Sequence, residues 1–156
     1  MADRITDEGR GAGSTATSAR RTVLFVDDEP AILSSLRRSL RAPDVDVLTA
    51  ASGQEALETM ARSTVHVIVS DMRMPGMNGA ELLQQVLDRW PGTVRMLLTG
   101  HAEEDAVREA FDQARIHRMM HKPWDDGELR RTVREALGAG RELAAPAERS
   151  GPARAD

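Results

Sequence analysis

Short apolar segments alternate with amphipathic segments from about residue 21 to residue 139. Five apolar runs of strand length, each bounded by turn residues, predict strands at 22–26, 45–49, 65–70, 93–99 and 116–121. After each run, apolar residues recur every three or four positions, which is typical of one face of a helix. Five strands alternating with five helices predict an α/β fold, in which helices cover both faces of a parallel sheet.

Residues at the ends of these segments support the assignment. Pro30 suits the first turn of a helix, and Ser52 stands three residues before Glu55, the spacing of a capping box. The runs at 45–49 and 116–121 are the least apolar of the five, so we expect them near the edges of the sheet.

The two ends of the chain differ from its middle. Residues 1–20 and 140–156 are rich in Gly, Ser, Ala, Pro and charge and lack apolar periodicity. We therefore predict a disordered N-terminal arm, one domain at 21–139 and a flexible C-terminal tail. A chain of 156 residues suits a single core.

Composition narrows the classes of function. With 40% hydrophobic residues, 29% charged residues and a net charge of −4, the chain lacks the basic character of a nucleic-acid-binding domain. It contains neither a membrane-spanning run nor the apolar core of a signal peptide, so we expect a cytoplasmic protein with neither membrane nor nucleic acid as partner. It has no cysteine, and its four histidines lack the spacing of zinc ligands, so any metal must be bound through oxygen.

Polar residues gather at the carboxyl ends of the predicted strands. The first strand is followed by Asp27 and Asp28, the third by Asp71, the fourth ends on Thr99, and the fifth is followed by Lys122. In an open parallel sheet these ends share one edge, where ligands bind. The only lysine among the 21 Lys and Arg residues stands at this edge, which favours a specific role for its ammonium. An aspartate can also simply begin a turn, but the convergence of five residues favours a functional site.

The chemistry of this set points to phosphoryl transfer. Three carboxylates brought together repel one another, and one lysine cannot balance them, whereas Mg²⁺ can. An aspartate can act as a nucleophile towards phosphorus and form an aspartyl-phosphate. In this interpretation Mg²⁺ and Lys122 neutralise the phosphoryl oxygens, and Thr99 donates a hydrogen bond to one of them.

The order and spacing of these residues resemble the receiver domain of two-component response regulators. The resemblance covers roughly residues 21–139 and rests on Asp27-Asp28, the segment D-M-R-M-P-G-M-N-G that begins at Asp71, Thr99-Gly100 and Lys122-Pro123. It implies a flavodoxin-like five-stranded sheet of order 2-1-3-4-5 with five helices.

The resemblance also implies the roles of the site residues. Asp71 is expected to accept a phosphoryl group from a histidine kinase or phosphotransfer protein. Mg²⁺ is expected to bind Asp28, Asp71 and the backbone carbonyl of Arg73, with Asp27 acting through water. Lys122 and Thr99 would contact the phosphoryl group.

The chain departs from the family pattern at Met119. Family members usually carry Tyr or Phe three residues before the lysine, and a methionine there can repack readily but lacks the phenolic hydroxyl. His117, two residues away, is either a partial substitute for this ring or a solvated strand residue. We expect Arg73 and His101, each two residues beyond a site residue, to lie at the rim of the pocket and to modulate the lifetime of the phosphoryl group.

The favoured function is a stand-alone receiver, monomeric or weakly dimeric, that signals by phosphorylation-dependent protein–protein interaction or by phosphorelay. Its partner would bind the face formed by the helix starting at 102–105, the strand at 116–121 and the helix starting at 125 or 126. The protein would catalyse only its own phosphorylation and dephosphorylation, so we do not expect an enzyme in the usual sense. Two alternatives stay open: a magnesium-dependent phosphohydrolase with an aspartyl nucleophile, and an interaction module that is not phosphorylated.

Overall fold

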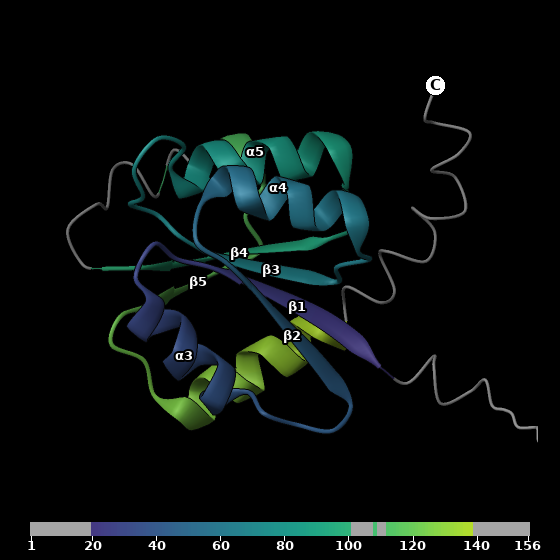
Figure 1. Ribbon diagram of the computed structural model, residues 1–156, viewed down its shortest axis with the longest axis vertical. Coiled ribbons are helices and arrows are strands. Elements are labelled where there is room, and N and C mark those ends of the chain that lie inside the picture. The colour runs from purple at the N-terminus through teal and green to yellow at the C-terminus, as the bar shows by residue number, and fades with distance from the viewer. Residues whose placement is uncertain (1–19, 101–107, 109–111, 139–156) are drawn as a thin grey trace, which may run out of the picture.

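The computed structural model describes residues 20–100, 108 and 112–138. Five parallel strands form one sheet in the order β2-β1-β3-β4-β5 (Figure 1). This order confirms the predicted flavodoxin-like sheet, with the two least apolar strands at its edges. The strands are β1 (Arg21–Val26), β2 (Val45–Ala50), β3 (Val67–Asp71), β4 (Val94–Thr99) and β5 (Arg118–His121).

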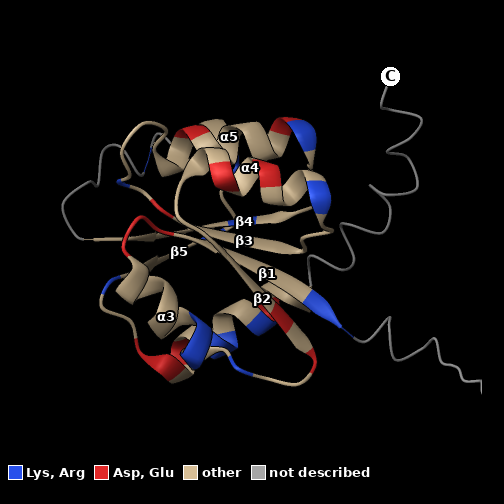
Figure 2. Cartoon of the chain, viewed as in Figure 1, with Lys and Arg blue, Asp and Glu red and all other residues tan. Residues whose placement is uncertain are grey.

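Helices cover both faces of the sheet. One face carries α4 (Gly53–Arg62) and α5 (Gly79–Arg89), and the other carries α3 (Pro30–Ser39) and a helical run at 126–138 (Figure 1). Acidic residues gather where β1 leads into α3, whereas basic residues lie along α3 and the 126–138 run (Figure 2). Within the described residues, no helix has the length and apolar content needed to cross a bilayer.

The core has two apolar layers because the strands are buried on both faces. In β1, Leu24 and Val26 point into the layer under α4 and α5, and Val23 and Phe25 point into the layer under α3. All four side chains are at most 1% exposed. Successive residues of a strand point to opposite faces, so a continuous apolar run is what a doubly covered parallel strand requires.

Side-chain caps fix the first turns of two helices that pack on the sheet. The Ser52 hydroxyl accepts the N–H of Glu55 at 3.1 Å, but the Glu55 carboxylate accepts the N–H of Ala51 at 2.8 Å instead of that of Ser52, so the predicted capping box is shifted by one residue. A complete capping box begins α5 instead. There Asn78 accepts the N–H of Glu81 at 2.8 Å, and Glu81 accepts the N–H of Asn78 at 2.9 Å.

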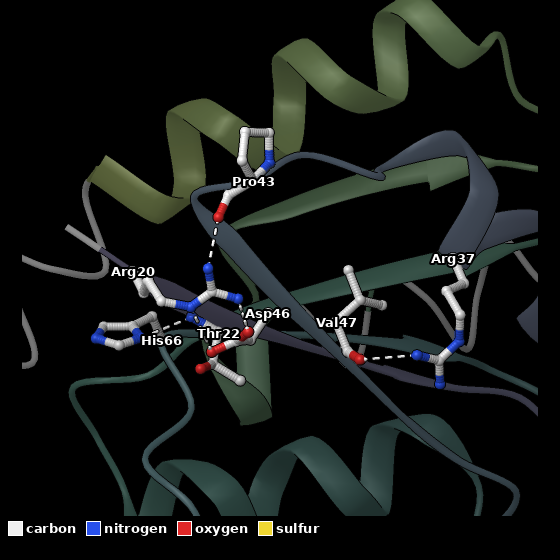
Figure 3. Close-up of polar contacts among 7 residues, drawn as sticks. All are labelled: Arg20, Thr22, Arg37, Pro43, Asp46, Val47 and His66. Atoms are coloured by element: carbon white, nitrogen blue, oxygen red, sulfur yellow. Dashed lines mark hydrogen bonds and ion pairs between the residues drawn. The ribbon is translucent and has the colours of Figure 1, made fainter. Parts of the chain in front are cut away.

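Arginine side chains cover the edge strand β2 (Figure 3). Arg37 reaches from α3 and donates to the carbonyl of Val47 at 3.1 Å and to the Thr49 hydroxyl at 3.0 Å. Arg20 pairs with Asp46 at the start of the same strand. Because an uncovered edge strand can pair with another chain, these contacts protect the side of the sheet farthest from β5.

Candidate functional site

The carboxyl-terminal edge of the sheet brings Asp27, Asp71 and Lys122 into contact. Asp27 follows β1 directly, Asp71 is the last residue of β3, and Lys122 follows β5. The Lys122 Nζ lies 2.9 Å from Asp27 Oδ2 and 3.2 Å from Asp71 Oδ1. Asp27 is only 1% exposed and Asp71 only 7%. One ammonium therefore bridges two buried carboxylates from non-adjacent parts of the chain.

Asp28 adds a third, exposed carboxylate to this group. Ligand oxygens of Asp27, Asp28 and Asp71 all lie within 4.8 Å of one another. Their spacing, and the fact that every donor atom is an oxygen, fit a hard divalent cation such as Mg²⁺. Lys122 supplies one positive charge against three negative charges, so the cluster favours a further cation.

Burial and charge set the protonation of the bridged pair. Burial raises the pKa of Asp71, the negative charge of Asp27 raises it further, and Lys122 acts in the opposite direction. For Lys122, burial alone would lower the pKa, but the hydrogen bonds and charges of Asp27 and Asp71 outweigh it, and the pKa lies above its usual value. The ammonium therefore stays charged beside a carboxylate that is more basic than usual.

Two glycines shape the loop that follows Asp71, each for a different reason. Gly76 has φ +78°, a left-handed conformation that favours glycine. A Cβ built on Gly79 would overlap the carbonyl oxygen of Asp71, because the start of α5 packs directly on that peptide. The Gly79 N–H donates to the carbonyl of Met72 at 2.8 Å. The backbone of Asp71 is thus held by the first turn of α5 as well as by β3.

Thr99 lies at the same edge of the sheet. It is the last residue of β4 and 1% exposed, and its hydroxyl donates to the carbonyl of Gly100 at 3.1 Å. Its carbonyl accepts the N–H of Lys122 at 2.9 Å, which ties the end of β4 to the lysine. Its hydrogen bond to a phosphoryl group stays a prediction.

Among the predicted modulating residues, Met119 and His117 lie in different places. Met119 is partly buried and packs against the core layer under α4 and α5. His117 precedes β5, so it lies at the amino-terminal edge of the sheet, a full strand away from Lys122. Its ring Nδ1 accepts the N–H of Arg95 at 3.0 Å, a placement that does not favour a switch role. Arg73 is exposed in the loop after Asp71, and His101 lies outside the described residues.

The environment of Arg95 is a feature that the sequence pattern did not predict. This arginine is only 3% exposed, and its guanidinium donates to the carbonyls of Thr93 at 2.7 Å, Ala114 at 3.0 Å and Arg115 at 3.2 Å. Burial, with a smaller contribution from the charge of Arg115, lowers the pKa of Arg95 to about 10. The available signal was an arginine inside the apolar run at 93–99.

The sequence matches a known family and several curated proteins. The family model for the response regulator receiver domain covers residues 23–134. The chain is 40% identical over 118 residues to the hydrogenase transcriptional regulatory protein HoxA of Cupriavidus necator, covering 76% of this chain and 24% of that protein. It is 36% identical over 118 residues to the DNA-binding transcriptional regulator NtrC of Escherichia coli, with 76% and 25% covered. The chain therefore spans about a quarter of the length of these relatives.

Solved structures show the same architecture. The signal receiver domain of an HD domain-containing protein from Pseudomonas fluorescens Pf-5 matches with a TM-score of 0.76 at 32% identity, covering 79% of this chain and 98% of that one. The chemotaxis protein CheY4 of Vibrio cholerae matches with a TM-score of 0.70 at 27% identity, covering 76% and 99%.

Proposed function

The chain belongs to the response regulator receiver family, and from this we propose that it is a phosphorylation switch with Asp71 as phosphoacceptor. The phosphoryl group would come from a histidine kinase or a phosphotransfer protein. The observation that carries the proposal is the Lys122 ammonium, which lies between Asp27 and Asp71 at 2.9 and 3.2 Å. An ammonium beside the nucleophile is placed to neutralise the phosphoryl oxygens as they arrive.

Asp71 would act as the nucleophile in this transfer. A carboxylate oxygen of Asp71 forms a bond to phosphorus while the bond from phosphorus to the donor nitrogen breaks, and the leaving imidazole takes up a proton. Burial, which raises the pKa of Asp71, makes this carboxylate more nucleophilic than an exposed one. Thr99 would donate a hydrogen bond to a phosphoryl oxygen.

The proposed metal ligands are Asp28, Asp71 and the backbone carbonyl of Arg73, with Asp27 acting through water. Bound Mg²⁺ would supply charge neutralisation at the phosphoryl oxygens. Asp27 is oriented for its part because one of its oxygens accepts the N–H of Glu29 at 2.9 Å and the other contacts Lys122.

Phosphorylation of Asp71 would be signalled to a protein partner. Met119 would replace the usual aromatic switch residue, since it packs against the core and a methionine repacks readily. Arg73 and His101 would modulate the lifetime of the phosphoryl group. The output face would include β5, the 126–138 run and the predicted helix starting at 102–105, whose start lies outside the described residues. We also propose that it acts in the cytoplasm, by protein interaction or by phosphorelay.

The test is incubation of the chain with acetyl phosphate and Mg²⁺, followed by intact-mass measurement, with Asp71→Asn as control. We expect a stable gain of one phosphoryl group that the control lacks. Continuous release of phosphate from varied substrates would favour the phosphohydrolase instead. The absence of both products would favour the interaction module that is not phosphorylated.

A further inference from the structure

The loop after Lys122 is fastened to the end of α3 by three side chains, Ser39, Trp124 and Asp126, which we call the loop latch. The Ser39 hydroxyl donates to Asp126 Oδ1 at 2.7 Å, and the Trp124 indole N–H donates to the same oxygen at 3.2 Å. The indole nitrogen also lies 3.5 Å from the Ser39 oxygen. A single carboxylate oxygen thus joins the loop to α3. Ser39 lies 87 residues before Asp126 and 85 residues before Trp124 in the sequence.

The helical end of the latch is itself held in place. Ser39 is the last residue of α3 and only 8% exposed. Its carbonyl accepts a hydrogen bond from Arg130 of the 126–138 run at 3.2 Å. Trp124 packs in part against the core layer under α3 and also lines an open pocket of about 330 Å³ that Arg38 lines too. The hydrogen bonds of the indole N–H therefore act together with this packing to fix the position of Trp124.

Lys122 stands between two anchors of the main chain. Before Pro123, the Lys122 N–H donates to the carbonyl of Thr99 at 2.9 Å; after Pro123, the latch holds Trp124. A lysine side chain is flexible, so the direction of the main chain at its base limits which oxygens its ammonium can reach.

We propose that the loop latch is a positioning device, which fixes the main chain after Lys122 so that its ammonium reaches Asp71. This inference rests on the proposed function for its link to phosphorylation. The competing explanation is that the latch only adds stability by joining α3 to the last helix. The two explanations differ in what happens to Lys122 in a variant that is weakened but folded.

The chain offers a matched control in the neighbouring carboxylate. Asp125 accepts the N–H of Glu128 at 2.9 Å and so caps the 126–138 run, without belonging to the latch. Asp125→Ala weakens the same helix start as Asp126→Ala and leaves the latch intact. A purely stabilising role predicts similar behaviour for the two variants, whereas a positioning role predicts a difference at Lys122.

Because Lys122 is the only lysine, labelling with ¹³Cε-lysine gives a single NMR signal that reports its surroundings without any phosphodonor. We expect this signal to move in Asp126→Ala and, less, in Trp124→Phe, which removes the indole N–H together with the five-membered ring and keeps a six-membered aromatic ring. Phosphorylation of Asp71 by acetyl phosphate should slow about tenfold in Asp126→Ala, since small misplacements of a catalytic group have large costs. Asp126→Asn, which keeps an oxygen acceptor, should restore most of both properties.

The results separate the two proposals. An unmoved Lys122 signal in folded Asp126→Ala, or equal effects in Asp125→Ala, would overturn the positioning role. If Asp126→Ala does not fold, the Lys122 signal of Trp124→Phe is used as the criterion instead, and an unmoved signal there would overturn the positioning role. If the latch variants move the signal but the unaltered chain gains no phosphoryl group, the positioning role stands and the proposed function fails.

Discussion

At the carboxyl-terminal edge of the sheet, Lys122 is shared between the buried carboxylates of Asp27 and Asp71, whereas at the amino-terminal edge the buried Arg95 donates only to backbone carbonyls. Both edges bury charge, and they satisfy it differently. At the first edge, charged side chains face one another and the negative charges are in excess. At the second, the guanidinium is surrounded by the backbone carbonyls of Thr93, Ala114 and Arg115, to which it donates.

Two histidines extend the same contrast. His66 lies just before β3, and its ring Nδ1 accepts the backbone N–H of Thr22 at 3.1 Å (Figure 3). Its backbone N–H donates to the Thr22 carbonyl at 2.9 Å. His117, just before β5, makes the same pair of bonds with Arg95, at 3.0 and 2.8 Å. Each histidine prolongs the ladder of the sheet through its ring.

This difference separates a site from a scaffold. Polar groups that are saturated by the backbone stabilise the fold and offer nothing to a ligand. Carboxylates that exceed their cations bind further positive charge and carry perturbed pKa values, which are features of functional sites. The following substitutions test whether chemistry belongs to one edge and stability to the other.

Asp71→Asn should have the largest effect, abolishing the chemistry without costing stability. An amide cannot form the acyl-phosphate, so phosphoryl incorporation should fall by at least about a thousandfold, as measured by intact mass. The same change should stabilise the fold at neutral pH by about 1 kcal/mol, since burial disfavours the charged carboxylate.

The stabilisation has a defined pH dependence. A carboxyl group whose pKa is raised above 3.8 binds its proton more tightly when folded, so its charged form destabilises the fold increasingly as pH rises through that range. Denaturant unfolding should therefore show the advantage of Asp71→Asn at pH 7 and little of it near pH 3. Incorporation that persists in this variant would place the phosphoacceptor elsewhere.

Arg95→Met should do the reverse, costing stability and sparing the chemistry. It removes the guanidinium that donates to the buried carbonyls of Thr93 and Ala114, so we expect a loss of about 3 kcal/mol in the free energy of unfolding. Phosphorylation of the folded fraction should stay within about twofold. The control is Arg118→Met, an exposed arginine that pairs with Glu135 at 2.9 Å, for which about 0.5 kcal/mol or less is expected. Equal losses in the two variants would contradict this account.

Gly79→Ala should affect both properties, because Gly79 joins scaffold and site. The added methyl group overlaps the Asp71 carbonyl, so the start of α5 or the end of β3 must shift. We expect a loss of about 2 kcal/mol and slower phosphorylation. Gly138→Ala is the matched control, since a Cβ there meets nothing within 4 Å. A neutral Gly79→Ala would show that α5 does not hold the peptide of Asp71.

The contrast between the two edges also explains which of them the sequence could predict. The carboxyl-terminal edge was predictable because apolar runs end on Asp27, Asp71 and Lys122, and each run is a local pattern. The amino-terminal edge was not, because the partners of Arg95 depend on the register of β4 against distant parts of the chain. No local pattern in the sequence reports that register.

The predicted and observed boundaries of β5 differ because side-chain burial begins before backbone pairing does. The strand predicted at 116–121 begins only at Arg118, although Ile116 is buried as its apolar character suggests. Arg115 adopts φ +51°, a turn conformation that a residue of its type rarely takes, so the chain joins the ladder later than the apolar run begins. Apolar character predicted the burial of this segment better than its hydrogen bonding.

His117→Asn should give the smallest effect, visible only as a change in pH dependence. Burial lowers the pKa of His117 and the charge of Arg95 lowers it further, with partial opposition from the hydrogen bond of the Arg95 N–H. Above the unfolded value of 6.5 the ring is neutral in both states and its bond to Arg95 is intact. As pH falls below that value, the unfolded chain takes up a proton more readily than the folded one, so stability decreases.

Because the ring is half exposed, this loss should be a few tenths of a kcal/mol between about pH 7.5 and pH 5.5. Asparagine keeps an acceptor near the position of Nδ1 but does not titrate, so urea unfolding of His117→Asn should be flatter over that interval. Titration of Asp71 has the opposite effect on stability, since its raised pKa makes the fold more stable as the pH falls. Acidification should therefore stabilise the carboxyl-terminal edge of the sheet and destabilise the amino-terminal edge. If the free energy of unfolding depends on pH in His117→Asn as it does in the unaltered chain, His117 makes no titratable contribution to the amino-terminal edge.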